Sequence, residues 1–399
     1  MLPLEGVRIL AVEQYGAGPW GTQYLADLGA EIVKLENPKD GGDYARGIGP
    51  HFIEGAGDSS SASLFFQAIN RNKKSLTVDL TTPEGQAVLH DLVPTADAVC
   101  CNLRGDVPAK LGITYATLGR INPRIVCAML SAYGREGPRA TWPGFDYLMQ
   151  AEAGYFAVTG EPGTPPARFG LSVVDLMTGL AMAYSTAAAI IGARASGQGR
   201  DVDVSLFDLA LSNLSYPAAW YLNTGHNQGR EPRSGHPSLV PCAMYRTKDG
   251  WIFIMVNKEK FWPILAKAVG HPEWAEDPRF RTFKERLAHR AEIQDLLDAA
   301  LSHRTTAEWL DAFAGDVPAA PINDVAQALE NPFVTENGKL QDLMHQSGVP
   351  FRLLDSPFRA GAPTPNRPAP ELGEHTDALL TELGYDTAKI AGLRSRGIV

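Results

Sequence analysis

The sequence predicts an α/β protein with a mostly parallel sheet, and three observations lead to this prediction. Short apolar runs recur through the first third of the chain, and helix-like segments separate them. The chain has 399 residues, which is enough to bury a sizeable core and is more than one domain usually contains. Hydrophobic residues make up 44% and charged residues 20%, as in ordinary globular domains. Strands that alternate with helices at this spacing favour parallel pairing.

A recognisable turn or helix start follows several of the predicted strands. The first strand leads into Gly16-Ala-Gly-Pro-Trp-Gly21 and a helical stretch that reaches Leu28. After the third strand, Thr82 supplies a capping hydroxyl, Pro83 suits the first helical position, and Glu84 puts an acid in the first turn. The predicted strands are Val7–Val12, Glu31–Glu36, the alternating Leu76, Val78 and Leu80, Ala98–Cys101, Ile125–Leu130 and Asp201–Leu206.

The longest apolar stretch, Thr178–Ala193, is rich in alanine and predicts a buried helix. Tyr184, Ser185 and Thr186 interrupt it, so no uninterrupted run reaches the length of about 18 residues that a membrane span needs. The N-terminus has neither a basic nor an apolar signal region, so we expect no signal peptide. These features predict a cytoplasmic protein that does not bind a membrane.

In the second half of the chain the alternation of strands and helices gives way to a hairpin followed by helices, which predicts a smaller second domain. Ala243–Val256 reads as a hairpin that turns at Lys248-Asp249-Gly250. Helices are expected at Phe283–Leu301 and Ala307–Phe313, and Thr305 with Glu308 forms a capping box before the latter. The proline-rich segment 359–370 should be an extended connector.

Charge and composition weigh against two classes of partner. The formal net charge is −9, which argues against nucleic acid. The nine histidines show no metal-binding spacing, so we expect no protein-built metal site. None of the four cysteines, Cys100, Cys101, Cys127 and Cys242, belongs to a C-x-x-C pair, and we expect reduced, buried thiols.

The glycines of Gly16-Ala-Gly-Pro-Trp-Gly21 match the outline of a dinucleotide fingerprint. They follow a strand and open a helix, and Glu36 ends the next strand. Glycine lets the backbone approach a phosphate, and a helix N-terminus attracts anions. However, Pro19 and Trp20 stand where a dinucleotide loop needs small residues. We therefore expect a different phosphorylated or adenine-bearing ligand; a purely structural turn and an NAD(P) oxidoreductase are the alternatives.

Seven groups of residues occur along the chain in a characteristic order and spacing. They are Ala17-Gly-Pro19, Leu28-Gly-Ala-Glu-Ile-Val-Lys-Leu-Glu36, Asn70-Arg-Asn-Lys-Lys-Ser75 with Asp79-Leu80, Asn102-Leu103 with Lys110-Leu-Gly112, Gly144-Phe-Asp146, Thr159-Gly-Glu-Pro162 and Gly373-Glu-His-Thr-Asp377. Together they resemble the CaiB/BaiF group of family III CoA-transferases, whose superfamily includes α-methylacyl-CoA racemase. The resemblance runs from about residue 3 to residue 399, and no single motif is specific.

The resemblance implies a Rossmann-like large domain built from both chain ends, at 1–224 and 331–399, and a smaller α+β domain at 225–330. It also implies an interlocked homodimer, a coenzyme A thioester as substrate, and no tightly bound cofactor. Lys73, Arg104 and Lys110 suit the phosphates of CoA, and the alternative for each alone is an ordinary surface charge. The positions carried over as contacts of CoA are Gly16, Ala17, Asn37, Asn72, Lys73, Asn102, Leu103, Arg104, Lys110, Ser131 and Tyr133.

The nucleophile is the point where this sequence departs from the resemblance. Family transferases use a carboxylate that attacks the thioester, forms a mixed anhydride and then carries CoA as a thioester. In many members this carboxylate belongs to a Thr-Gly-Glu-Pro-Asp segment, and here Gly163 takes the place of the aspartate. We hypothesise that Glu161, two residues earlier, replaces it. The alternative is that Glu161 is a loop residue without a catalytic role.

Asp146 and Asp175 are the other catalytic candidates. The racemase branch uses a histidine and an aspartate 30 residues later, and these positions hold Phe145 and Asp175. Because the histidine is missing, racemisation is not expected, but one-base proton transfer through Asp175 is an alternative. Each aspartate could instead cap the helix that follows it.

The loop Arg233-Ser-Gly-His-Pro-Ser238 replaces the run of glycines that closes over the site in some transferases. It contains only Gly235, so we do not expect a mobile glycine lid. His236 either contacts substrate or belongs to a linker. The predicted function is transfer of CoA between an acyl-CoA and a small carboxylic acid; the alternatives are a proton-transfer isomerase and a CoA-binding protein without activity.

Overall fold

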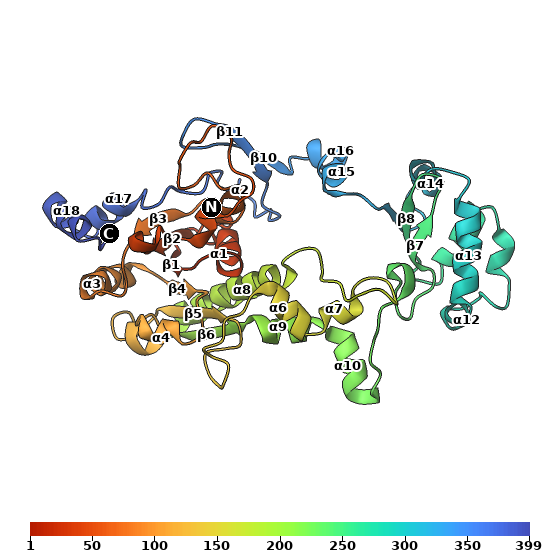
Figure 1. Cartoon of the computed structure of the whole chain (residues 1–399), viewed down its shortest axis with the longest axis horizontal. Coiled ribbons are helices and arrows are strands. Elements are labelled where there is room, and N and C mark those ends of the chain that lie inside the picture. The colour runs from red at the N-terminus through yellow and green to blue at the C-terminus, as the bar shows by residue number, and fades with distance from the viewer. The chain divides into compact units, whose positions relative to one another are not determined.

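The computed structural model describes all 399 residues, and the chain folds into two compact units (Figure 1). The large unit contains Met1–Ala153, Gly170–Leu214 and Phe333–Val399, and the small unit contains Gly154–Phe169 and Ser215–Pro332. Both chain ends therefore belong to the large unit. The sequence boundaries at 224 and 330 differ from this division, because residues 154–169, 215–224 and 331–332 belong to the small unit.

A six-stranded parallel sheet forms the centre of the large unit. Its order is β3-β2-β1-β4-β5-β6, the doubly wound order of a Rossmann-like fold, so the predicted α/β class is confirmed. The strands are β1 (Arg8–Val12), β2 (Glu31–Glu36), β3 (Lys74–Thr77), β4 (Ala98–Cys101), β5 (Val126–Ser131) and β6 (Arg200–Ser205). Val78 and Leu80, expected in the third strand, lie beyond the end of β3.

The main core of the large unit joins the sheet to the last residues of the chain. Leu10, Val33 and Val99 are fully buried in it, together with Leu380 and Ile390 from two C-terminal helices. The N–H of Asp79, just after β3, donates to the carbonyl of Ile398 at 2.8 Å. The helices of this core are α3 (Pro83–Leu92), α17 (Thr376–Glu382) and α18 (Thr387–Ser395). Thr82 caps α3 as expected, because its side chain accepts from the N–H of Gly85.

Two helices of the large unit, α1 (Ala17–Asp27) and α8 (Val173–Ser196), pack tightly against each other. A Cβ atom added to Gly21 of α1 would lie 2.3 Å from the carbonyl oxygen of Gly179 in α8. Only glycine allows this approach, because any larger residue would separate the backbones. The contact brings the first turns of the two helices together.

The helix α8 differs from its prediction in length and burial. Helix formation was expected at 178–193 in a buried position, but Tyr184 and Ile191 on α8 are 79% and 72% exposed. By length and composition α8 could cross a membrane, a property that core helices of other proteins share. Its buried face packs on α1, β5 and β6.

The small unit contains a three-stranded antiparallel sheet with helices. The predicted hairpin is confirmed as β7 (Cys242–Arg246) and β8 (Trp251–Met255), and β9 (Ala319–Pro321) pairs with β8. The helix expected at 283–301 is two helices that meet at His289. The expected capping box of Thr305 and Glu308 is present. The helices are α11 (Phe261–Ala268), α12 (Phe283–Ala288), α13 (Arg290–Leu301) and α14 (Thr306–Phe313).

The remaining elements are short. In the large unit they are α2 (Leu64–Asn70), α4 (Val107–Lys110), α5 (Tyr115–Leu118), α6 (Asp146–Glu152), α9 (Leu206–Asn213) and the hairpin of β10 (Leu340–Met344) and β11 (Pro350–Leu354). In the small unit they are α7 (Tyr155–Val158), α10 (Ser215–Thr224) and α15 (Val325–Leu329). The helix α16 (Pro332–Thr335) begins at the last residue of the small unit. The connector 359–370 contains no helix or strand, as expected.

Candidate active site

A cavity of about 270 Å³ lies in the large unit where β1, β4 and β5 end. The strand order reverses between β1 and β4, and open α/β sheets bind ligands at such a point, outside the carboxyl ends of the strands. Asp175 is the only acid among the lining residues and Arg104 the only base. The lining residues are Gln14, Tyr15, Gly16, Ala17, Asn102, Leu103, Arg104, Leu130, Ser131, Ala132, Trp142, Pro143, Gly144, Phe145, Asp175 and Leu206.

The first two glycines of the motif make room for side chains of this cavity. A Cβ atom on Gly16 would lie 2.6 Å from Oδ2 of Asp175, and one on Gly18 would lie 2.7 Å from Cγ of Asn102. The side chain of Asn102 in turn holds the loop after β1, because it exchanges two hydrogen bonds of 2.8 Å with the backbone of Gln14. The glycines therefore let Asp175 and Asn102 approach the start of α1.

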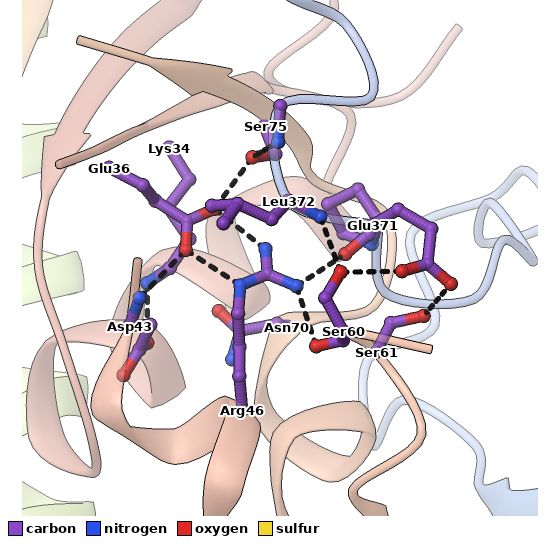
Figure 2. Close-up of polar contacts among 12 residues, drawn as sticks. Lys34, Glu36, Asp43, Arg46, Ser60, Ser61, Asn70, Ser75, Glu371 and Leu372 are labelled. Carbon is purple, nitrogen blue, oxygen red and sulfur yellow. Dashed lines mark hydrogen bonds and ion pairs between the residues drawn. The ribbon is translucent and has the colours of Figure 1, made fainter. Parts of the chain in front are cut away.

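Glu36, the acid of the apparent dinucleotide fingerprint, is not free to bind a ribose (Figure 2). Its carboxylate accepts from both Arg46 and Ser75, at 2.6–2.8 Å, and from the N–H of Asp43 at 2.9 Å. Burial raises the pKa of Glu36, but the hydrogen bond and charge of Arg46 outweigh burial, so the pKa lies below its usual value. A nicotinamide dinucleotide would therefore find no free acid at this position.

Asp175 has an unusual environment for a carboxylate. Its side chain is largely buried, and no ion pair with a lysine, arginine or histidine is formed. Burial, and after it the negative charge of Asp146, raises the pKa of Asp175 to about 7. Perturbed carboxylates in a cavity are candidates for chemistry. Asp175 can exist in either ionisation state near neutral pH.

The two predicted capping roles are wrong in detail. Phe145, not Asp146, is the residue that precedes α6, and Asp146 is its first helical residue. The side chain of Asp146 instead accepts from the N–H of Asp175 at 2.9 Å, so it caps the start of α8. Asp175 does not precede its helix either, because it lies in the first turn of α8.

Six of the predicted contacts of CoA are brought together around the cavity: Gly16, Ala17, Asn102, Leu103, Arg104 and Ser131. Arg104 is exposed and pairs with Asp106, whose carboxylate also binds Lys110. The first-turn N–H groups of a helix have no intrahelical acceptor. Gly16 and Ala17 at the start of α1 line the cavity with Asp175, so a carboxylate and the N-terminus of a helix lie side by side there.

The other predicted contacts do not line the cavity and have partners within the chain. Asn37 caps a short turn through the N–H of Lys39. Asn72 binds Asp27, and the hydroxyl of Tyr133 donates to Glu152. Their roles, and that of Lys110, remain predictions.

Lys73 belongs to a buried charge network beneath the loop after β1. Its Nζ lies 2.7 Å from Glu13 and also donates to the carbonyl of Pro19 at 2.8 Å. Lys34 lies 2.7 Å from Asp43, whose carboxylate accepts from the N–H of Tyr15. Burial lowers the pKa of Lys73 to about 8 despite the charge of Glu13. This position cannot reach a phosphate without leaving its partners.

Several residues of the site were not predicted from the sequence. Gln14, Tyr15, Trp142 and Pro143 line the cavity, and Glu13 anchors the network beneath it. A charged residue such as Glu13 at the end of an apolar strand was the available signal, because strand ends at this sheet edge carry functional side chains. Nothing comparable marks Trp142, which reaches the cavity from a loop.

Glu161 lies in the small unit, where its carboxylate accepts from the N–H of Arg233 at 2.8 and 3.0 Å. The guanidinium of Arg230 donates to the carbonyls of Glu161 and Thr164. Arg233 has a φ of +58°, a strained conformation that these contacts hold. In the same loop, Nδ1 of His236 accepts from two backbone N–H groups. Glu161 thus has a structural partner, and its catalytic role remains a hypothesis.

Comparison with known proteins identifies the family. Residues 4–376 match the model of CoA-transferase family III. The chain belongs to this family. It is 34% identical over 389 residues to the succinate–glutarate CoA-transferase of Agrobacterium fabrum, covering 96% of both chains. It is 32% identical over 407 residues to the human succinyl-CoA:glutarate CoA-transferase, covering 100% of this chain and 90% of that one.

Solved structures agree with the family. A CaiB/BaiF family protein from Brucella suis has a TM-score of 0.82 and 33% identity, covering 96% of this chain and 99% of that one. Rv3272 of Mycobacterium tuberculosis has a TM-score of 0.81 and 30% identity, covering 94% and 98%. The family III enzyme predicted from the sequence is therefore confirmed: it transfers CoA between an acyl-CoA and a carboxylic acid.

Proposed function

We propose that Asp175 is the nucleophile of CoA transfer in this enzyme and that the acids it serves are short dicarboxylic acids. The observation that carries the proposal is the position of Asp175 as the only acid lining the cavity, where no cation contributes to its pKa. The alternative nucleophile, Glu161, accepts two hydrogen bonds from the N–H of Arg233.

The chemistry that we assign to Asp175 has four steps. A carboxylate oxygen attacks the thioester carbonyl carbon, the C–S bond breaks, and CoA leaves as the thiolate. The thiolate attacks the side-chain carbonyl carbon of the mixed anhydride, which releases the donor acid and leaves CoA on Asp175 as a thioester. The acceptor carboxylate attacks this thioester and expels the thiolate again. The thiolate finally takes the acyl group of the acceptor, and Asp175 returns as a carboxylate.

Backbone donors of α1 support these steps. Each attack places negative charge on a carbonyl oxygen, and N–H groups at a helix N-terminus stabilise such charge. Gly16 lets Asp175 approach the start of α1, because a side chain there would collide with Oδ2 of Asp175. The attacked oxygen would therefore form close to these donors.

The substrate class rests on the named relatives. Proteins 31–34% identical to this chain over nearly its whole length are named for succinate, glutarate, oxalate, mesaconate and citramalate. All of these are short dicarboxylic acids, and no single one is favoured by identity; the relative named for oxalate is also named for acetyl-CoA, the thioester of a monocarboxylic acid. Arg104, the only base lining the cavity, suits the phosphates of CoA.

We further propose that the enzyme is a cytoplasmic homodimer. Large apolar side chains are exposed on two helices, including Tyr184 and Ile191 of α8 and Leu222 of α10. Exposed apolar patches of this kind mark protein contacts, and a second copy is the partner that the family resemblance implies. All four cysteines are free and buried, which suits a reducing compartment. Sedimentation of the purified protein tests the dimer.

Trapping with hydroxylamine tests the nucleophile. The wild-type enzyme is incubated with succinyl-CoA, glutaryl-CoA or acetyl-CoA and hydroxylamine, which converts a carboxylate-linked thioester or anhydride into a stable hydroxamate. Intact-mass spectrometry and peptide mapping then locate it. We expect the hydroxamate on Asp175, with transfer abolished in Asp175→Asn and retained in Glu161→Gln and in Glu330→Gln, an exposed control.

Two results would contradict the proposal in different ways. A hydroxamate on Glu161 would establish the displaced nucleophile instead. An unmodified protein that still binds CoA would favour proton transfer or binding without activity. Transfer rates with a panel of mono- and dicarboxylic acids test the substrate class, and a preference for monocarboxylic acids would overturn it.

A further inference from the structure

The start of α8 is capped by a residue from another helix. Ser172, the residue that precedes α8, makes no side-chain cap. The first-turn N–H of Asp175 instead donates to Oδ2 of Asp146 in α6 at 2.9 Å. Such N–H groups need an acceptor because the helix supplies none. Asp146 therefore fixes the backbone of the residue that we propose as nucleophile.

Gln150 holds Asp146 in this position. It lies one turn later in α6 and is fully buried. Its amide nitrogen donates to Oδ1 of Asp146 at 2.5 Å and to the carbonyl of Leu171 at 3.0 Å. The two contacts connect α6 to the residue just before α8. Both oxygens of Asp146 thus have a defined donor.

The one charge that shifts the pKa of Asp175 is the carboxylate of Asp146. Asp146 faces it from α6, and Tyr15 faces it from the loop after β1. Burial raises the pKa of Tyr15, and the charge of Asp175 raises it further, so this phenol is neutral at physiological pH. No lysine, arginine or histidine from α1, α6, α9 or the sheet contributes to the pKa of Asp175. Asp146 is the charge that acts on it.

We propose that Asp146 and Gln150 are positioning residues for Asp175: Asp146 fixes its backbone and presents it with a like charge, and Gln150 holds Asp146 in place. The inference rests on the proposed role of Asp175. A like charge disfavours ionisation of a carboxyl group, and a more basic carboxylate is a stronger nucleophile. The pair therefore fixes the geometry of the nucleophile, and the charge of Asp146 adds to burial in raising the pH at which it becomes active.

The pH profile of kcat/KM separates charge from packing. Asp146→Asn keeps an oxygen that can accept from the N–H of Asp175 and removes the charge; its NH2 group then faces Gln150, whose amide must turn over to accept from it. We expect its acid limb to move to lower pH by about one unit, the size of a neighbouring-charge effect. Asp146→Ala removes the cap as well, and we expect its plateau kcat to fall at least about tenfold below that of Asp146→Asn, with KM for acyl-CoA little changed.

Gln150→Leu supplies a second variant with Asp146 intact. We expect a lower plateau kcat and an acid limb near that of the wild type. Asp342→Asn, an exposed acid-to-amide control on β10, should leave the profile unchanged. Thermal unfolding of each variant shows that the comparison is made on folded protein. If Asp146→Asn does not fold, the plateau kcat of Gln150→Leu decides whether the positioning inference holds.

An acid limb that stays in place in Asp146→Asn would overturn the inference, as would a wild-type kcat in Gln150→Leu. Asp175→Asn separates this failure from failure of the proposed function. If Asp175→Asn still transfers CoA, the proposed nucleophile is wrong. If it is inactive while Asp146→Asn has the wild-type profile, only the positioning inference fails.

Discussion

The large unit holds buried carboxylates in two regions that differ in their partners. In the network beneath the loop after β1, Glu13 pairs with Lys73 and Glu36 pairs with Arg46. In both, the nearby cations outweigh burial, so the pKa values lie below their usual range. Asp175 faces another carboxylate instead, and its pKa is raised to about 7. A buried carboxylate that is paired with a cation therefore has a structural role, whereas a buried carboxylate without such a partner is a candidate for catalysis.

Removing one charge of the buried Lys73–Glu13 ion pair should give the largest change in stability. Lys73→Met leaves Glu13 buried with only Lys34 nearby, at 3.6 Å. Removing one partner of a buried ion pair strands a charge, so we expect a loss of about 3 kcal/mol in the free energy of unfolding. Urea denaturation measures it. A urea midpoint equal to that of the wild type would show that the fold does not depend on the pairing of Glu13 with Lys73.

Crowding the unpaired carboxylate is the next test. A Cβ at position 16 would lie 2.6 Å from Oδ2 of Asp175, so Gly16→Ala must displace the carboxylate. Because small misplacements of reacting groups are costly, we expect kcat to fall about 100-fold with the fold retained. Gly47→Ala, where the added atom meets nothing within 4 Å, is the matched control. Equal rates in the two variants would contradict the geometry.

Removing the unpaired carboxylate should stabilise the protein at high pH. The pKa of Asp175 rises from 3.8 to about 7 in the folded chain, so its ionised form destabilises the fold. The penalty is absent below about pH 4, grows up to about pH 7 and is constant above that. At about 1.4 kcal/mol per pKa unit, a rise of about three units corresponds to about 4 kcal/mol. Because the buried amide of asparagine still costs free energy when it leaves water, we expect Asp175→Asn to gain roughly half of this at pH 8, about 2 kcal/mol, and little at pH 4. Denaturation at both pH values measures this, and a gain that is larger at pH 4 would contradict it.

The pH dependence of transfer should follow the ionisation of Asp175. The nucleophile must be a carboxylate, so the rate should rise with pH, about tenfold per unit below pH 7, and level off above it. Steady-state rates in buffers of constant ionic strength measure this. A flat profile between pH 5 and 7 would show that an ordinary carboxylate carries the reaction.

The exposed charges should matter least for stability. Lys110→Met removes an exposed partner of Asp106, so the free energy of unfolding should hardly change. If Lys110 contacts a phosphate of CoA, as the sequence predicts, KM for acyl-CoA should rise a few-fold. An unchanged KM would remove Lys110 from the binding site.

The sequence predicted features that depend on neighbouring residues and missed those that depend on residues far away in the chain. Local patterns predicted β2 and β4 with their bounds, the cap of Thr82 and the capping box of Thr305 and Glu308, because each depends on neighbours in the chain. Six of the residues that the family resemblance implies as contacts of CoA line the cavity, and their contact with CoA stays a prediction. The partners of Lys73 and Asp146 were missed, because Glu13 and Asp175 lie 60 and 29 residues away.

Burial could not be read from residue type either. Lys73 looked like a surface cation, yet its side chain is fully enclosed. The helix α8 looked like a core helix, yet several of its apolar side chains are exposed. In both cases the burial of a side chain depends on which other elements pack against it, and a local sequence pattern does not contain that information.

The pairing of Asp146 with Asp175 has a consequence for the catalytic cycle. If Asp175 is acylated, as we propose, it loses its charge and the repulsion by Asp146 in the resting enzyme disappears. The like charge therefore raises the free energy of the empty enzyme more than that of the covalent adduct. The equilibrium between the free enzyme and its covalent adduct is therefore shifted towards the adduct, by about tenfold if the like charge is worth about one pKa unit.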